Sequence, residues 1–168
     1  MMKFSKVPFS TYVEDRGYNM PECTQAELEM LWNEYEDIKL PKRGTSGSAG
    51  YDFFAPVDIE IKKGEYVIFS TGITFNTDRD DVFFMCVPRS GLGFKYQTQL
   101  ANTVGIIDSD YCKSDNQGHI KVKMTANYDI LIEKGKAFMQ GIIVPFLKVD
   151  DDNIKTERNG GFGSTDNK

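Results

Sequence analysis

One stretch of the chain, from Leu100 to Tyr111, concentrates side chains that can do chemistry. It carries the amide of Asn102, the carboxylates of Asp108 and Asp110, and the phenol of Tyr111. An amide presents a hydrogen-bond donor beside an acceptor, and a carboxylate can accept a proton or hold a hydroxyl group. An aromatic ring can form the floor of the same pocket. These residue types predict a site that holds a planar polar ring by its edges.

The backbone of this stretch is predicted to form two short strands joined by a hairpin at Thr103 to Gly105. Apolar and polar residues alternate beside the turn, and glycine is a common turn residue. A hairpin with ordinary polar turn residues looks the same, so the stretch alone leaves both interpretations open. Other segments of the chain must decide between them.

Two further segments carry groups that could bind an anion or a metal ion. Pro88 to Gly93 follows an apolar strand predicted at 82–87. There, Arg89 and Ser90 combine a guanidinium group, a hydroxyl and exposed N–H groups into a compact anion site. Asp52 lies inside an apolar strand, where aspartate is disfavoured, so it needs a partner. That partner is predicted to be an arginine or a metal-bound water.

The C-terminal tail has a composition that cannot form a stable element alone. Glycines surround Phe162, Arg158 precedes them, and the hydroxyls of Ser164 and Thr165 follow. Such a composition is typical of a frayed terminus. It also suits an arm that closes over a site, because glycine N–H groups and an arginine can bind phosphate while the ring stacks on a base.

Composition limits the classes of protein to consider. At 168 residues and 19.0 kDa, the chain is long enough for one domain and short for two. A net charge of −5 argues against nucleic-acid binding. No apolar run resembles a membrane span or a secretory leader, so we expect no membrane contact and a cytoplasmic location. The three cysteines are expected to be free thiols, and the single histidine, His119, is given no role.

The periodicity predicts a mostly β chain with one added helix. Residues 1–23 show no sustained period and are predicted to be an irregular arm with room for one short strand. The pair Thr24 and Glu27 forms a capping-box pattern that begins an amphipathic helix over 25–38, with an apolar face expected to pack in the core or at an interface. From Lys39 onward, short alternating runs predict an all-β barrel or sandwich. The predicted strands are 51–55, 57–62, 65–69, 72–76, 82–87, 104–107, 119–126, 129–132 and 138–148.

Several segments, taken in their order along the chain, resemble the motifs of the trimeric dUTP diphosphatase (dUTPase) family. They are AGYDFFA at 49–55, PRSGLG at 88–93, NTVGIIDSDY at 102–111, KGKAFMQ at 134–140 and RNGGFGST at 158–165. The resemblance covers residues 39–165. It implies an all-β, dUTPase-like distorted jelly-roll barrel over 39–150 and a flexible C-terminal arm over 151–168 that closes an active site. The N-terminal arm and amphipathic helix, residues 1–38, are an addition to this core.

The resemblance also implies an activity, the hydrolysis of dUTP to dUMP and pyrophosphate. Asp108 would orient and activate the water that attacks the α-phosphorus. Asn102, with backbone groups around Gly105 and Ile107, would read the uracil edge, and Tyr111 would pack under the sugar and exclude a ribose 2′-hydroxyl. The other implied substrate-binding residues grip the phosphates or close over the nucleotide, and they are Arg89, Ser90, Gly91, Gln140, Arg158, Phe162, Gly163, Ser164 and Thr165.

A metal ion and an oligomer are implied as well. Asp52 would hold the hydration shell of a Mg²⁺ ion that bridges the phosphates. In the family three subunits share every site, so the resemblance implies a homotrimer. This allocation is physically reasonable, because hydrolysis at phosphorus needs an aligned water, neutralised charge and a site closed to bulk solvent.

The chain departs from the family pattern at several positions. Ala137 stands where the fourth motif usually has an arginine, and the neighbouring Lys136 is expected to point to the opposite face of its strand. A polar loop at 112–118 replaces a short turn. In the tail, Asn159 stands alone where two residues are usual, and Asp166 replaces a glycine. These departures concern phosphate affinity and closure more than reaction class.

Two alternatives remain, the first an enzyme of the same superfamily and the second a protein of a different functional class. One is a dCTP deaminase or bifunctional deaminase, which needs a carboxylate near C4 of cytosine, and the predicted hairpin offers no suitable glutamate. The other is a regulatory module that senses dUTP and contacts a protein partner through residues 1–38.

Overall fold

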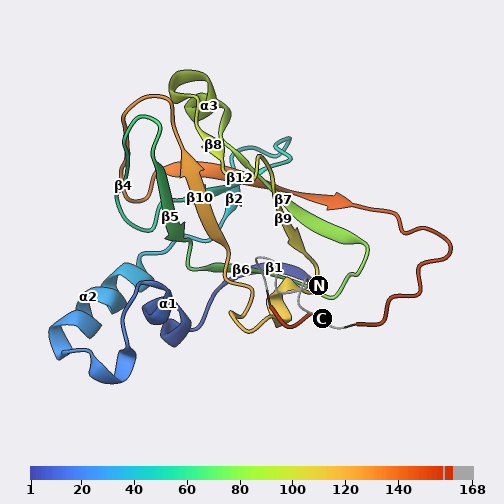
Figure 1. The fold of residues 1–168 in the computed structure, drawn as a ribbon, viewed down its shortest axis with the longest axis horizontal. Coiled ribbons are helices and arrows are strands. Elements are labelled where there is room, and N and C mark those ends of the chain that lie inside the picture. Colours follow the sequence, from blue (N-terminus) through green and yellow to red (C-terminus); the bar gives the residue numbers. More distant parts are fainter. Residues whose placement is uncertain (157, 161–168) are drawn as a thin grey trace.

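The computed structural model describes residues 1–156 and 158–160, and β-strands dominate them (Figure 1). The strands are β1 (Met2–Lys6), β2 (Lys42–Arg43), β3 (Tyr51–Phe54), β4 (Ile59–Ile61), β5 (Tyr66–Ser70), β6 (Ile73–Thr77), β7 (Val82–Pro88), β8 (Gln99–Leu100), β9 (Gly105–Asp108), β10 (Lys121–Thr125), β11 (Ile130–Ile132) and β12 (Ala137–Pro145). The helices are α1 (Phe9–Asp15), α2 (Gln25–Glu36) and α3 (Ser90–Tyr96), with 3₁₀ turns η1 (Met20–Glu22) and η2 (Tyr111–Lys113). The predicted mostly β architecture is confirmed.

The strands form several small antiparallel sheets. The largest has the order β2-β3-β12-β7-β9, and a second has the order β5-β10-β8. Two further pairs, β1 with β6 and β11 with β4, complete the arrangement. Strands β9 and β10 therefore belong to different sheets, and the space between these sheets is where the predicted site lies. After β12 the chain extends away from the sheets and then returns towards the N-terminus (Figure 1).

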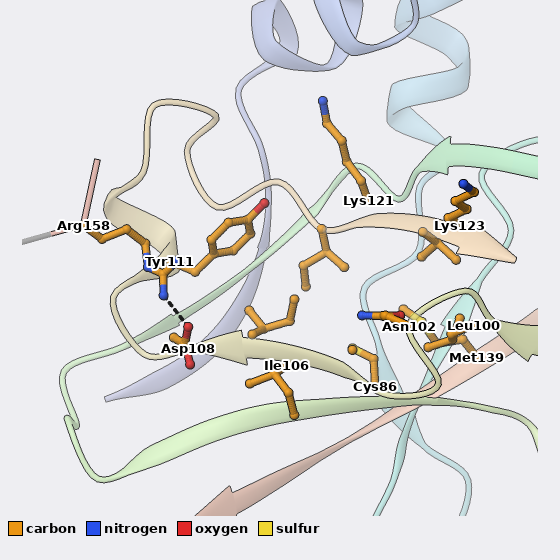
Figure 2. A pocket seen from close by; sticks show the side chains of 14 residues that line it. Cys86, Leu100, Asn102, Ile106, Asp108, Tyr111, Lys121, Lys123, Met139 and Arg158 are labelled. Atoms are coloured by element: carbon orange, nitrogen blue, oxygen red, sulfur yellow. Dashed lines mark hydrogen bonds and ion pairs between the residues drawn. The ribbon is translucent and has the colours of Figure 1, made fainter. Parts of the chain in front are cut away.

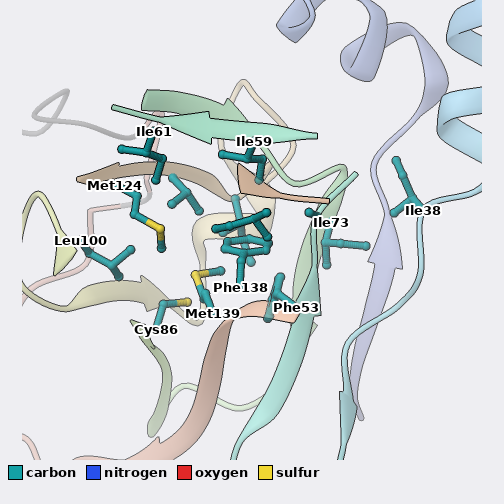
Figure 3. Packing of buried hydrophobic residues seen from close by; sticks show 14 of the residues in the cluster. Ile38, Phe53, Ile59, Ile61, Ile73, Cys86, Leu100, Met124, Phe138 and Met139 are labelled. Carbon is teal, nitrogen blue, oxygen red and sulfur yellow. The ribbon is translucent and has the colours of Figure 1, made fainter. Parts of the chain in front are cut away.

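The hydrophobic core fills the space between the sheets. Figure 3 shows Phe138 and Met139 of β12 at its centre, with Ile59 and Ile61 of β4 beside them, and all four side chains are buried. Burying a side chain of this size contributes roughly 1.5–3 kcal/mol. The core therefore fixes β12, which carries residues of the predicted site on its neighbouring positions.

A glycine on β12 allows this close packing. A Cβ atom at Gly141 would lie 1.9 Å from Cζ of Phe84, whose ring is fully buried. That ring stacks on Phe75 at a centroid distance of 5.1 Å and contacts Phe53 at 5.7 Å. Only a residue without a side chain fits at this position.

The predicted capping box begins α2, as expected. The Glu27 N–H donates to Thr24 Oγ1 at 3.3 Å, and the Thr24 N–H donates to the Glu27 carboxylate at 2.8 Å. The helix ends at Glu36, earlier than the predicted residue 38. On its apolar face Leu31 is buried, while Trp32 remains 47% exposed.

Residues 1–23 are more regular than predicted, because the one short strand allowed there is present as β1 and a helix that was not predicted follows it. Strand β1 pairs with β6, and α1 follows directly. The pairing joins residues far apart in the sequence, and α1 is short and has no side-chain cap, so neither element has a strong local signal. Val7 and Tyr12 enter the same core as the barrel strands, so the N-terminal segment packs as part of the barrel.

A further short helix, α3, begins within the segment Pro88 to Gly93, where no helix was predicted. It contains Gly91 and Gly93 and lacks a side-chain cap, so its sequence resembles a turn. Tight turns lie at Gly64 and Gly135, and both glycines have positive φ. Within the described part of the chain, no helix is long and apolar enough to cross a membrane.

Candidate active site

A cavity of about 180 Å³ lies between β9 and β10 (Figure 2). Asn102, Asp108, Tyr111 and Arg158 all line it. They come from the turn after β8, from β9, from η2 and from the C-terminal segment. The fold thus gathers into one cavity side chains that the sequence suggests for one nucleotide site.

The turn that carries Asn102 differs from the predicted hairpin. Thr103 is in the left-handed region with φ 66°, its N–H donates to the Leu100 carbonyl at 2.9 Å, and the two residues form an isolated bridge. Beyond the turn the two strands diverge, because β8 pairs with β10 while β9 pairs with β7. The turn lies where it was predicted, but the strands on its two sides do not pair with each other as a hairpin would. This divergence opens the cavity between the two sheets.

Gly105 serves packing rather than turn geometry. It lies opposite Cys86 in the β7–β9 ladder, and a Cβ atom there would lie 3.1 Å from the Cys86 Cβ. The backbone at this position therefore approaches the cavity wall more closely than another residue would allow. Ile107, two residues further on, packs partly against the core and lines the cavity.

Asp108 and Asp110 both bind Arg158. The guanidinium Nη2 forms an ion pair with the Asp108 carboxylate, and Nε donates to Asp110 Oδ1 at 2.8 Å. The Arg158 guanidinium also lies 5.9 Å from the centre of the Tyr111 ring. Burial lowers the pKa of Arg158, but the hydrogen bond to Asp110 and the charge of Asp108 more than offset this and raise it overall. The Arg158 guanidinium group is thus a positive charge that is paired with both carboxylates.

The Tyr111 ring is buried, and its hydroxyl is held by the polar loop at 112–118. The hydroxyl donates to the His119 carbonyl at 3.2 Å and accepts from Asn116 Nδ2 at 2.8 Å. Ser114 Oγ donates to the Tyr111 carbonyl at 2.6 Å, which anchors the backbone of the same residue. The loop that departs from the family pattern therefore holds the ring against the cavity together with the His119 carbonyl.

Four residues of the cavity wall could not be predicted from the sequence. Cys86 of β7 and Met139 of β12 supply apolar surface, while Lys121 and Lys123 of β10 supply cations. The strand at 119–126 was predicted, but its neighbours depend on the sheet order, which has no local signal. Burial raises the pKa of the Cys86 thiol to about 12, so this side chain is a neutral wall and not a nucleophile.

The predicted anion-binding residues lie elsewhere on the same chain. Arg89 immediately precedes α3, and its Nε lies 3.2 Å from Asp52 Oδ1, so an arginine is the partner of this aspartate. Arg89 and Ser90 line a separate shallow cavity, together with Thr98. In the described part of the chain, the buried hydroxyl of Thr98 has no hydrogen-bond partner.

Gln140 belongs to this second group. It is paired with Asp52 on β3 and with Val87 on β7, so it stands between the two strands that lead to the anion-binding residues. Gly50 leaves room for it, because a Cβ there would lie 2.4 Å from Gln140 Oε1. Neither Gln140 nor Gly91 lines the first cavity among the residues described.

Four of the predicted substrate-binding residues lie outside the described part of the chain, and they are Phe162, Gly163, Ser164 and Thr165. Lys136 precedes β12, whose register shifts between Ala137 and Met139, so strand alternation does not apply to it.

The acidic side chains available for a metal ion are few. Among the residues described, no cluster of three or more histidine, cysteine, aspartate or glutamate side chains could hold one. Asp52 is a single carboxylate beside Arg89. It still fits a Mg²⁺ ion bound chiefly by substrate phosphates and water, because Mg²⁺ commonly uses only one or two protein carboxylates.

Comparison with known proteins identifies relatives with this sequence and fold. The dUTPase family model matches residues 36–166. The chain is similar to the deoxyuridine 5'-triphosphate nucleotidohydrolase of Lactococcus lactis, with 40% identity over 133 residues, which covers 76% of this chain and 88% of the relative. It is also similar to the crystal structure of dUTPase from Streptococcus mutans, with a TM-score of 0.63 and 28% identity, covering 88% of this chain and 98% of that one.

A third relative is a mutant dUTPase from phage phi11 of S. aureus. Its TM-score is 0.60 at 17% identity, and the match covers 72% of this chain and 92% of that one. At this identity the likeness concerns the fold alone. That phage protein coordinates a structural Mg(II) ion. With the S. mutans structure, it confirms the predicted dUTPase-like barrel.

Proposed function

Because this chain belongs to the dUTPase family of hydrolases, we propose that Asp108 activates the water that splits dUTP into dUMP and pyrophosphate. The observation that carries the proposal is the convergence of Asn102, Asp108 and Tyr111 on one cavity. An amide, a carboxylate and an aromatic floor match the base, the reacting centre and the sugar of a deoxyuridine nucleotide.

Recognition of the nucleotide follows from the cavity walls. The Asn102 amide and the backbone around Gly105 and Ile107 pair with the polar edge of uracil. The close approach of β9 to Cys86 leaves little space for the methyl group of thymine. The Tyr111 ring packs under the sugar, and its fixed position excludes a 2′-hydroxyl.

The reaction needs one positioned base. Asp108 accepts a proton from water as the water oxygen bonds to the α-phosphorus, and the bond to the bridging oxygen breaks to release pyrophosphate. Arg158 must leave the Asp108 carboxylate before this can happen, since it now occupies that group. Substrate phosphates offer the arginine a stronger anionic partner.

The phosphate-binding residues support a shared site. Arg89, Ser90 and Gln140 lie apart from the cavity that holds Asp108. A homotrimer in which one subunit grips the phosphates at another subunit's cavity brings the two groups together. In this assembly the segment around Arg158 and the residues after it close over the nucleotide.

Mg²⁺ is the proposed cofactor, held through water by Asp52. It supplies neutralisation of the charge that develops on the phosphates. Arg89 keeps the Asp52 carboxylate in place for this role. A cytoplasmic location is also proposed, supported by the free state of Cys23, Cys86 and Cys112.

The proposal is tested by supplying each deoxynucleoside triphosphate with Mg²⁺ and measuring pyrophosphate. We expect release from dUTP alone. Asp108→Asn should bind nucleotide yet lose about 10²–10⁴-fold in kcat, as for loss of a general base. Asp115→Asn, an exposed change in the nearby loop, is the matched control. Near-normal turnover by Asp108→Asn would refute the mechanism, and ammonia release from dCTP would favour the deaminase alternative.

A second function, contact with a protein partner through residues 1–38, is favoured by one surface. Phe9, Met20, Leu28 and Trp32 line an open groove beside α2. Between Tyr18 and Ile38 the chain carries acidic residues and no lysine or arginine. We expect a basic amphipathic peptide to change the fluorescence of the single tryptophan, with weaker binding at high salt. An acidic peptide is the control, and equal binding of both would contradict the idea.

A further inference from the structure

The N-terminal segment reaches the wall of the nucleotide cavity through one carboxylate. Asp15 is the last residue of α1. Its Oδ2 lies 2.5 Å from His119 Nδ1, and its Oδ1 accepts from Lys121 Nζ at 2.5 Å. Lys121 lines the cavity, and His119 immediately follows the loop that holds Tyr111. A helix outside the family core therefore contacts one residue of the cavity wall, Lys121, and one residue beside the Tyr111 loop, His119.

The hydrogen bonds of His119 define its tautomer. The Gly72 N–H donates to Nε2 at 2.7 Å, so Nε2 carries no proton. Nδ1 must then carry the proton and donate it to Asp15. The side chain is fully buried, with a partner at each ring nitrogen. This arrangement fixes the ring between α1 and the start of β6.

The backbone of His119 holds the Tyr111 ring, which we propose to pack under the sugar. The His119 carbonyl accepts from the Tyr111 hydroxyl at 3.2 Å, and the His119 N–H donates to the Asn116 carbonyl at 3.1 Å. Asn116 in turn donates to the Tyr111 hydroxyl. Fixing the His119 ring therefore also fixes the acceptor that orients the Tyr111 ring.

Asp15 also binds the ammonium group of Lys121 at the cavity edge. In Figure 2 the Lys121 side chain points towards the helix and away from Asp108. Its ammonium group is bound by Asp15, and both side chains are partly buried. Without this carboxylate, the ammonium group would be free to turn towards the nucleotide.

We propose that Asp15 and His119 are positioning residues for the sugar side of the nucleotide cavity. Through them, the added N-terminal segment helps the site to reject ribonucleotides. The inference rests on the proposed function, because it assigns a selectivity role within the same site. It differs from a general stabilising role, which would change unfolding without changing the choice between deoxyribose and ribose.

The test compares Asp15→Ala, Asp15→Asn and Glu14→Gln in the full chain. Glu14 is exposed on the same helix, so its variant matches the loss of charge without touching the cavity. The readout is the ratio of kcat/KM for dUTP to that for UTP, together with the inhibition constants of dUMP and UMP. Circular dichroism and thermal unfolding establish that each variant is folded.

We expect Asp15→Ala to reduce the preference for dUTP over UTP about tenfold, since small displacements of positioning groups cost this much or more. Asp15→Asn keeps an oxygen for His119 and should lose less. Glu14→Gln should keep the wild-type ratio. If the alanine variant does not fold, the asparagine variant decides by the same ratio.

The outcomes separate the two proposals. A wild-type protein that releases no pyrophosphate from dUTP overturns the proposed function. Normal wild-type turnover, combined with folded Asp15 variants whose preference stays within twofold of wild type, overturns the positioning role alone. A lower unfolding temperature with an unchanged ratio has the same meaning, because it leaves only a structural role.

Discussion

Replacing Arg158 with alanine sets two opposite effects against each other. The arginine occupies Asp108, so removing it frees the carboxylate that we propose to be catalytic. The arginine is also the charge that we expect to move onto the substrate phosphates. Which effect is larger decides whether the variant is faster or slower than the wild type.

The structure indicates the size of each effect. The side chains of Asp108 and Asp110 are 49% and 43% exposed, so solvent screens both ion pairs. Partly exposed pairs of this kind contribute roughly 0.2–1 kcal/mol each. Charge-assisted hydrogen bonds to phosphate in a closed site contribute about 1.5–3 kcal/mol. The loss of phosphate contact should therefore outweigh the gain at Asp108.

We expect Arg158→Ala to lower kcat/KM for dUTP about tenfold, measured by pyrophosphate release. Raising the ionic strength should affect the wild type more than the variant, because salt weakens charge pairs. Arg79→Ala is the matched control, since it also breaks an exposed arginine–aspartate pair but lies outside the cavity lining. A variant faster than the wild type would refute this reasoning and make the ion pair inhibitory.

Three further predictions concern stability and reactivity. Gly141→Ala should lower the free energy of unfolding by about 3 kcal/mol in urea denaturation, because its Cβ overlaps the buried Phe84 ring, whereas Gly47→Ala, with open space around it, should change little. Burial lowers the pKa of His119 below 6.5, so the unfolded chain takes up the proton first and stability should fall as the pH drops from 7 towards 5; a constant urea midpoint over this range would contradict this. Cys86 should resist alkylation at pH 8 until the protein unfolds, while mass spectrometry should find the other two cysteines modified earlier.

Local signals account for what the sequence predicted of the fold. The Thr24 capping box marks the start of α2, and alternation marks the longer strands because each buries one face. The elements that were missed or predicted without bounds depend on distant partners or have no cap. Strand β1 is stabilised by pairing with β6, and α3 contains two glycines that resemble a turn.

The candidate site divides in the same way. Asn102, Asp108 and Tyr111 lie within one short stretch, so their proximity could be predicted from spacing. The lysines of β10 reach the cavity only because two sheets diverge there, which no local pattern encodes. The hydrogen bond between Asp15 and His119 joins residues 104 positions apart, so the sequence could not predict it either.

We propose that Asp108 directs water to the α-phosphorus, and hydrolysis in water enriched in oxygen-18 is the decisive test of that claim. Mass spectrometry of the two products shows which phosphorus received the water oxygen. The claim predicts the label in dUMP, unlabelled pyrophosphate, and almost no labelled dUMP from Asp108→Asn. Label in pyrophosphate, or normal labelling of dUMP by Asp108→Asn, would contradict it.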